Sequence, residues 1–149
     1  VVGFNYRMTD IQAAIGIVQL DKLDDFINQR NLIAKKYSEI LEKFEWIEIP
    51  KINAESRHAW QAYVLRIRKP NHLQFRNRLM EYLHQNGIAT RPGTHAIHTL
   101  KVYRKLFKFK DTDFPKSLLA MESSMAIPLH NNLTVNETNY ILQKIAEFE

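Results

Sequence analysis

The chain has 149 residues, of which 45% are hydrophobic, and this is enough to bury one sizeable core or a small domain with an attached helical arm. It contains no cysteine, which excludes disulfides and thiolate metal sites and leads us to expect a cytoplasmic protein. The net charge of +5 comes from 21 basic and 16 acidic residues that are interspersed, so it does not by itself indicate a nucleic-acid-binding protein.

The first residues, 1–7, lack the basic-then-apolar layout of a signal peptide. No stretch of the sequence approaches the apolar length that a transmembrane helix needs. An initiator methionine is also absent, so we expect the chain to begin inside a longer protein.

The sequence after residue 8 predicts a long helical arm. Thr9 and Gln12 have the spacing of a capping box, in which each side chain bonds the other residue's backbone N–H. Apolar residues with helical spacing then continue over roughly 35 residues, far above the usual length of a helix, so we expect a bend at residues 20–22. The first apolar stripe comprises Ile11, Ala14, Ile15 and Val18, and the second comprises Leu20, Leu23, Ile27, Ala34, Tyr37 and Leu41.

The rest of the sequence predicts strands and helices in alternation. A short strand or extended link is expected at residues 46–52, and strands are expected at 60–67, 88–91 and 125–129. Helices are expected at residues 71–83, 113–123 and from 134 to the end.

Two local signals support these helices. Gly87 suits the position just after the first of them, and Thr134 with Glu137 forms a second capping box at the start of the last. The order of elements predicts an α+β domain, with a small sheet and helices packed on it, preceded by the helical arm.

Several familiar catalytic motifs are missing from the sequence. There is no glycine-rich phosphate loop and no serine in a nucleophile elbow. His95 and His98 stand three residues apart, but no acidic residue accompanies them in a known ligand spacing, so no metal site is predicted.

Residues 101–110 alternate basic side chains with Tyr103, Phe107 and Phe109. Such interleaving can bind single-stranded nucleic acid. An amphipathic turn of helix with solvated lysines is the interpretation we favour for a single patch of this size.

Residues 3–8 place the amide of Asn5 and the guanidinium of Arg7 directly before the capped helix. The alternatives are a binding segment and an ordinary turn with surface side chains.

Residues 88–98 form a second unusual segment, in which a strand leads into a loop rich in hydrogen-bond donors. Arginine and histidine side chains can donate to phosphate or sugar oxygens, while the alternative is a structural loop with a buried, satisfied histidine. The candidate binding residues of this loop are Arg91, Thr94, His95 and His98.

Taken in order, these segments resemble the DegT/DnrJ/EryC1/StrS family of nucleotide-sugar aminotransferases over essentially the whole chain. Residues 3–16 resemble the family block G-[YF]-N-[YF]-R-[ML]-x-[ED]-[IL]-x-A-A-[IL]-G, and residues 19–23 and Arg30 continue it. Residues 87–92 resemble the following strand-to-loop segment, and residues 127–134 resemble the block L-P-L-x-x-x-[LM]-[ST] before the final helix.

The resemblance implies a fold type I transferase that forms a homodimer, with active sites at the subunit interface. Residues 1–20 would then finish the large cofactor-binding domain, residues 21–45 would form the interdomain arm, and residues 46–149 would form the small C-terminal domain. The apolar stripe of the arm would pack on the large domain.

The resemblance also implies pyridoxal 5′-phosphate as the cofactor. In the family this cofactor carries an amino group from a donor amino acid, usually glutamate, to a nucleotide-linked keto-sugar, for surface polysaccharide or related glycan biosynthesis. The Schiff-base lysine precedes the first family block, and no lysine of this chain matches it, so no catalytic residue is assigned and this segment alone is expected to be inactive. Neither a nucleic-acid nor a membrane partner is expected.

By the same resemblance, Asn5 hydrogen-bonds the cofactor phosphate of the other subunit, and Arg7 recognises the carboxylate of the donor. The loop would line the sugar-nucleotide side through Arg91, Thr94, His95 and His98. Many relatives carry a tyrosine after the Arg-Pro pair, whereas this chain has Gly93 and Thr94 there, so the sugar and the nucleotide stay unassigned.

Three alternatives remain open at this point. A sugar dehydratase of the same fold carries histidine in place of the Schiff-base lysine, at a position outside this sequence. A non-catalytic basic module could bind nucleic acid through residues 101–110. An interaction domain could use the helical arm alone.

Overall fold

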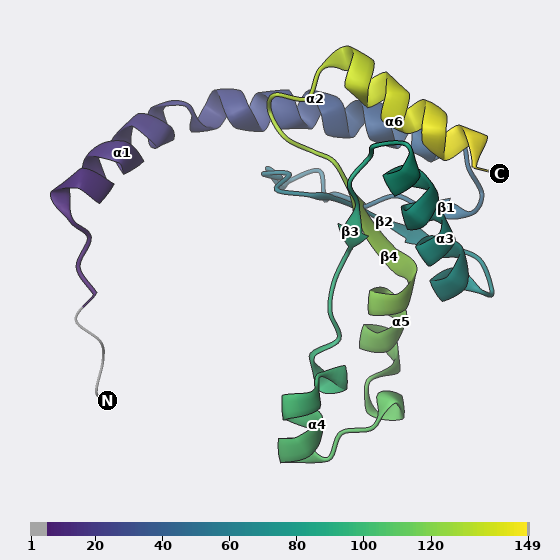
Figure 1. The fold of residues 1–149 in the computed structure, drawn as a ribbon. Coiled ribbons are helices and arrows are strands. Elements are labelled where there is room, and N and C mark those ends of the chain that lie inside the picture. Colours follow the sequence, from purple (N-terminus) through teal and green to yellow (C-terminus); the bar gives the residue numbers. More distant parts are fainter. Residues whose placement is uncertain (1–5, 149) are drawn as a thin grey trace.

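The computed structural model describes residues 6–148 and shows an α+β domain from which two helical extensions project (Figure 1). The predicted cofactor ligand Asn5 lies outside the described residues. The helices are α1 (Asp10–Asp21), α2 (Leu23–Leu41), α3 (His72–Gln85), α4 (Lys101–Phe107), α5 (Pro115–Ser123) and α6 (Val135–Glu147), with short 3-10 turns at Ile97–Thr99 and Asp111–Asp113. The strands are β1 (Ile47–Glu48), β2 (Tyr63–Ile67), β3 (Arg91–Pro92) and β4 (Ser124–Ile127).

The strands form a small antiparallel sheet in the order β1-β2-β4-β3. Leu65 of β2 lies opposite Met125 of β4, and both are fully buried. Along β2 the next residue, Arg66, is exposed, as the two-residue side-chain period of a strand requires. The sheet therefore has one core face and one more open face.

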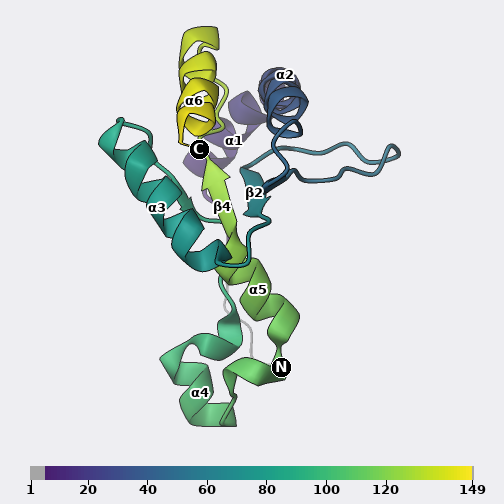
Figure 2. The same cartoon turned by 90° about the vertical axis from the view of Figure 1, so that its right-hand side faces the viewer.

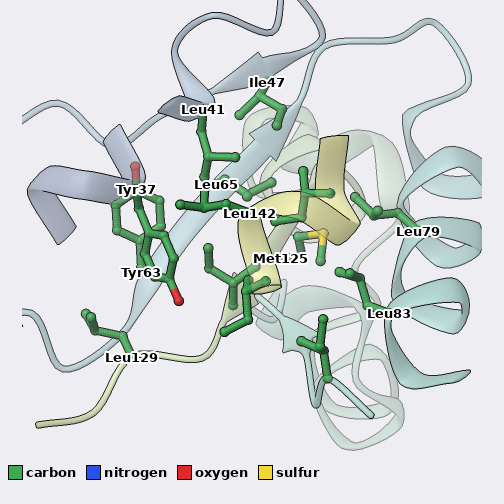
Figure 3. Close-up of a cluster of buried hydrophobic side chains, with 14 of the residues drawn as sticks. Tyr37, Leu41, Ile47, Tyr63, Leu65, Leu79, Leu83, Met125, Leu129 and Leu142 are labelled. Atoms are coloured by element: carbon green, nitrogen blue, oxygen red, sulfur yellow. The ribbon is translucent and has the colours of Figure 1, made fainter. Parts of the chain in front are cut away.

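Side chains from α2, α3 and α6 cover the core face (Figure 3), and Figure 2 shows the ribbons of these helices beside β2 and β4. Figure 3 shows Tyr37 of α2 beside Tyr63 of β2, with ring centroids 5.2 Å apart in an edge-to-face arrangement. Both hydroxyls are bonded, since Tyr37 donates to the Pro128 carbonyl at 2.9 Å and Tyr63 lies 2.9 Å from the Ser38 hydroxyl. The predicted α+β class is confirmed.

The local helix signals are also confirmed. Gln12 and Thr9 exchange both bonds of the first capping box, and Thr134 and Glu137 exchange both bonds of the second. Gly87 follows α3 with a φ of 76°, a left-handed conformation that glycine adopts without steric cost.

The arm bends where the sequence predicted. Helix α1 ends at Asp21 and α2 begins at Leu23, with Lys22 between them. The second apolar stripe is buried only from Ile27 onward, because Leu20 and Leu23 precede the part of α2 that reaches the core and remain exposed. The expectation that the stripe of the arm packs on a large domain is therefore wrong for this part, which packs on the core of the chain itself. No residue of α1 is buried.

The strand boundaries differ from those predicted. The segment 60–67 pairs only from Tyr63, because Trp60 has a φ of 47° and its backbone N–H bonds His58 Nδ1 at 3.0 Å. The strand expected at 88–91 begins only at Arg91, since Ile88 lies just after α3 and its N–H bonds back to the Leu83 carbonyl of that helix at 2.8 Å.

The second projection, here called the finger, comprises residues 97–114 (Figure 1). The chain leaves β3 to enter the finger and returns through α5 to β4. Its rings pack on one another, with Phe109 and Phe114 edge to face at 5.3 Å. Arg104 and Asp111 form an ion pair across it. The turn of helix predicted within residues 101–110 is α4, and its basic side chains are exposed. Its apolar side chains are exposed too, so the helix has no buried apolar face among the described residues.

Candidate functional site

The predicted binding residue Arg7 lies in the extended segment before α1, where its side chain is exposed. It borders a shallow hollow with Met8, Gln12 and Gly16. Among the described residues, only residues between 6 and 16 line this hollow, so none from the sheet or the helices packed on it takes part. Arg7 is therefore placed away from the other predicted site residues, and its binding role stays a prediction.

The four predicted residues of the loop do not gather at one place. Arg91 lines a cavity at the edge of the sheet, Thr94 lines a hollow on the open face, and His95 is exposed. His98 is buried at the base of the finger. Arg91 is thus separated from the residues that follow Gly93, and the binding roles of all four stay predictions.

The cavity beside Arg91, here called the edge cavity, has a volume of about 660 Å³. It is lined by residues 61–62, 87–91 and 126–130, together with Leu133 and part of α6. Its lining is mainly apolar, with a few polar side chains at the margin, and its size falls within the range of small-molecule sites, roughly 300–1,000 Å³.

Some polar side chains of the edge cavity form hydrogen bonds within the chain, and others do not. Glu137 accepts hydrogen bonds from the Thr134 N–H at 2.8 Å and the Thr134 hydroxyl at 2.7 Å, and these bonds lower the pKa of its carboxyl group. Tyr140 donates to the Asn86 carbonyl at 3.1 Å. No described residue bonds the side chains of Gln61, Thr90 and Arg91, whereas His130 interacts electrostatically with Glu137 and helps to lower the pKa of its carboxyl group.

The hollow on the open face depends on Gly93. A Cβ at this position would lie 2.5 Å from Val64 Cγ1 and 2.6 Å from Ser124 Oγ, closer than real Cβ contacts. The Gly93 N–H donates to the Ser124 carbonyl at 3.1 Å. Gly93 therefore lets the chain cross β4 and β2 closely, which brings Thr94 onto the open face of the sheet.

The same face carries an ion-pair group. Burial acts to raise the pKa of Glu48, but hydrogen bonds and positive charge from Arg66 and Arg68 outweigh it and lower that pKa. Glu48 and Arg66 both line the hollow that contains Thr94. Its polar margin is thus largely paired within the chain.

His98 is 4% exposed, and its ring lies 5.1 Å from the Phe114 ring. Its Nε2 atom is buried with no hydrogen-bond partner among the described residues. The alternative interpretation, a buried histidine with all its hydrogen bonds made, is therefore correct about the burial and wrong about the hydrogen bonds.

Arg76 is 7% exposed, and its role was not predicted from the sequence. Its guanidinium donates to the Met121 carbonyl at 2.6 Å and to Asn77 Oδ1, and so joins α3 to the end of α5. Burial lowers the pKa of Arg76. The signal was its spacing, because Arg76, Leu79 and Leu83 follow the period of the buried helix face.

The described residues do not by themselves fit a cofactor that forms a Schiff base. Such a cofactor needs a lysine in an enclosed site, but the lysine beside a described hollow, Lys51, is exposed. Within residues 6–148 no group of three or more histidine and acidic side chains could hold a metal ion. Nor does that part of the chain contain a helix that is long and apolar enough to cross a bilayer.

Solved structures with the same fold are much longer than this chain. Helicobacter pylori PseC, an aminotransferase involved in the biosynthesis of pseudoaminic acid, superposes with a TM-score of 0.87 over 99% of this chain and 39% of its own, at 20% identity. Spr1654 of Streptococcus pneumoniae is solved in PLP and PMP forms, and its PMP form gives a TM-score of 0.84 at 28% identity over 93% of this chain and 34% of its own. The chain therefore holds only part of the aminotransferase fold.

Relatives found by sequence agree with this. The uncharacterised protein MJ1066 of Methanocaldococcus jannaschii is 36% identical over 89% of this chain and 34% of its own length. The spore coat polysaccharide biosynthesis protein SpsC of Bacillus subtilis is 26% identical over 97% of this chain and 38% of its own length. The model of the DegT/DnrJ/EryC1/StrS aminotransferase family matches residues 1–146. This chain belongs to the DegT/DnrJ/EryC1/StrS aminotransferase family.

Proposed function

We propose that this chain is the C-terminal part of a pyridoxal-phosphate-dependent enzyme that transfers an amino group from an amino acid to a nucleotide-linked keto-sugar. The proposed donor is glutamate. The observation that carries the proposal is the family match over residues 1–146. The name of SpsC supports a role in surface polysaccharide or related glycan biosynthesis. The PLP and PMP forms of Spr1654 support the cofactor.

The division into domains is part of the same proposal. Residues 1–20 finish the large cofactor domain, residues 21–45 form the interdomain arm, and residues 46–149 form the small domain. The exposure of α1 supports this division, because no described residue buries its apolar side chains. A helix of 12 residues with no buried side chain has little stability of its own, so it needs a partner surface.

The cofactor contacts follow from the resemblance. Asn5 reaches the cofactor phosphate of the second subunit in a homodimer, and Arg7 binds the donor carboxylate. The exposure of Arg7 supports its role, because no hydrogen bond with a described residue occupies its guanidinium. The Schiff-base lysine lies upstream, so this chain alone does not transaminate.

The sugar-nucleotide side is formed by the loop after β3. Thr94 and His95 are exposed and available to a ligand, whereas His98 would act only after the finger has moved. Arg91 is set apart from these three by its position at the edge cavity, and its substrate role rests on the resemblance alone.

The test is the reaction of the longer polypeptide with glutamate and a nucleotide-linked keto-sugar, followed by mass spectrometry of the sugar. An amino sugar supports amino transfer. A deoxygenated sugar without nitrogen identifies the dehydratase instead. No conversion of any nucleotide-linked keto-sugar by a polypeptide loaded with the cofactor contradicts the proposal.

A further inference from the structure

We propose that the edge cavity is a binding site for a small molecule that joins an apolar body to a carboxylate, with Arg91 as its anion contact. The inference goes beyond amino transfer and does not depend on it. It gives Arg91 a ligand that Thr94, His95 and His98 do not share, because those residues lie elsewhere in the fold.

The floor of the cavity calls for an apolar ligand. Ile88, Ile127 and Leu129 are nearly buried by the protein, and each still forms part of the lining. Ala62 and Ala126 keep the side toward the open face shallow, since neither side chain extends beyond Cβ. A flat or aliphatic group of a few carbon atoms covers this surface and removes it from water.

The margin of the cavity calls for a negative charge. The side chain of Arg91 is exposed and forms no hydrogen bond or ion pair with a described residue. The one acidic side chain of the lining, Glu137, is a carboxylate whose lowered pKa favours the charged form, and its charge is engaged by two bonds from Thr134 and by the nearby His130. An incoming anion therefore meets an unpaired guanidinium, whose two N–H groups match the two oxygens of a carboxylate.

Gln61 and His130 supply further hydrogen bonds to the ligand. Both line the cavity; the Gln61 side chain has no partner among the described residues, and the His130 ring interacts electrostatically with Glu137 but forms no hydrogen bond with a described residue. An amide and an imidazole can each donate one hydrogen bond to an oxygen that Arg91 does not reach. A carboxylate on a short apolar body satisfies all three donors better than a bare inorganic anion, which leaves the apolar floor exposed.

The experiment measures binding of 4-fluorophenylacetate by fluorine NMR and calorimetry, in the 149-residue chain and in the longer polypeptide that carries it. Saturable binding is expected, with weaker binding by at least tenfold in Arg91→Gln, since a charged hydrogen bond is removed. Ala126→Leu, which fills the side of the cavity toward the open face, should weaken binding by a similar factor. Arg66→Gln is the matched control on the open face and should bind as the parent does.

Several results would overturn the proposal. One is an affinity for the neutral 4-fluorophenylacetamide equal to that for the acid, and another is a loss in Arg66→Gln equal to that in Arg91→Gln. In the longer polypeptide, binding that depends on Arg7 and not on Arg91 places the probe elsewhere. Inorganic phosphate that competes fully with the probe at similar concentration reduces the site to a general anion contact. Absence of saturable binding in chains whose circular dichroism shows them folded also ends the proposal.

Discussion

The exposed face of α1 makes a sharp prediction about Ile15, which is 60% exposed in a helix without buried residues. If α1 packs on an upstream domain, the substitution Ile15→Asp should destabilise the longer polypeptide and leave the 149-residue chain unchanged. Leu32→Asp is the matched control, because Leu32 is 70% exposed on the outer side of α2, whose opposite side forms the core.

The expected size follows from the area that Ile15 still exposes. Full burial of an isoleucine side chain stabilises a protein by about 1.5–3 kcal/mol, so burial of the remaining three-fifths contributes about 1–2 kcal/mol. Placing an aspartate in that interface adds a desolvation cost of at least the same order, which gives a total of about 2–4 kcal/mol. In the 149-residue chain the change should stay within about 0.5 kcal/mol, as for other surface substitutions.

Urea unfolding monitored by circular dichroism measures both values, and hydrogen exchange of the α1 amides gives a second readout. Protection of α1 should be near zero in the 149-residue chain and high in the longer polypeptide. The reasoning is refuted if Ile15→Asp costs 2 kcal/mol or more in the short chain, or if it costs no more than Leu32→Asp in the longer one.

Three further predictions concern the domain itself. Gly93→Ala should destabilise it by about 1–3 kcal/mol in denaturant titrations, because the new Cβ meets Val64 and Ser124. Gly16→Ala is the control and should be neutral or stabilising, because the space around Gly16 is open. Equal effects of the two substitutions would contradict the close crossing at Gly93. Thr134→Ala should lower the free energy of unfolding by about 1 kcal/mol, because the N-cap of α6 is removed. The pKa of Glu137 is lowered in the folded state, so its contribution to stability is present above the ordinary value of 4.5 and is lost as pH falls below it. The variant should therefore lose less stability in acid than the parent, and an unchanged acid midpoint would count against this. Tyr37→Phe should lower the free energy of unfolding by about 1–3 kcal/mol, because it leaves the Pro128 carbonyl without its hydrogen bond. Because burial raises the pKa of Tyr37, the parent should also lose stability as pH rises above 10. A variant that loses as much stability at alkaline pH would refute that cause.

The features that the sequence predicted well are those set by neighbouring residues. Both capping boxes, the bend at Lys22 and the left-handed Gly87 depend on residues within one or two turns of the chain, and each is present. The buried part of the arm from Ile27 onward follows the helical period because α2 lies directly on the core.

Features that depend on distant residues were less predictable. Trp60 belongs to a strand by composition, yet its indole N–H bonds Asn31 of α2 at 2.9 Å and its backbone turns away from the sheet. The separation of Arg91 from Thr94 arises from the close crossing at Gly93, which involves Val64 and could not be inferred from local spacing.

The most direct test of the proposed function is to find where the cofactor attaches. The longer polypeptide and the 149-residue chain are incubated with pyridoxal phosphate, reduced with borohydride, digested and analysed by mass spectrometry. We predict one modified lysine per longer polypeptide, upstream of this chain, and no stoichiometric labelling of the 149 residues alone. Stoichiometric attachment to a lysine within these 149 residues, or a longer polypeptide that takes up no cofactor, would contradict the account.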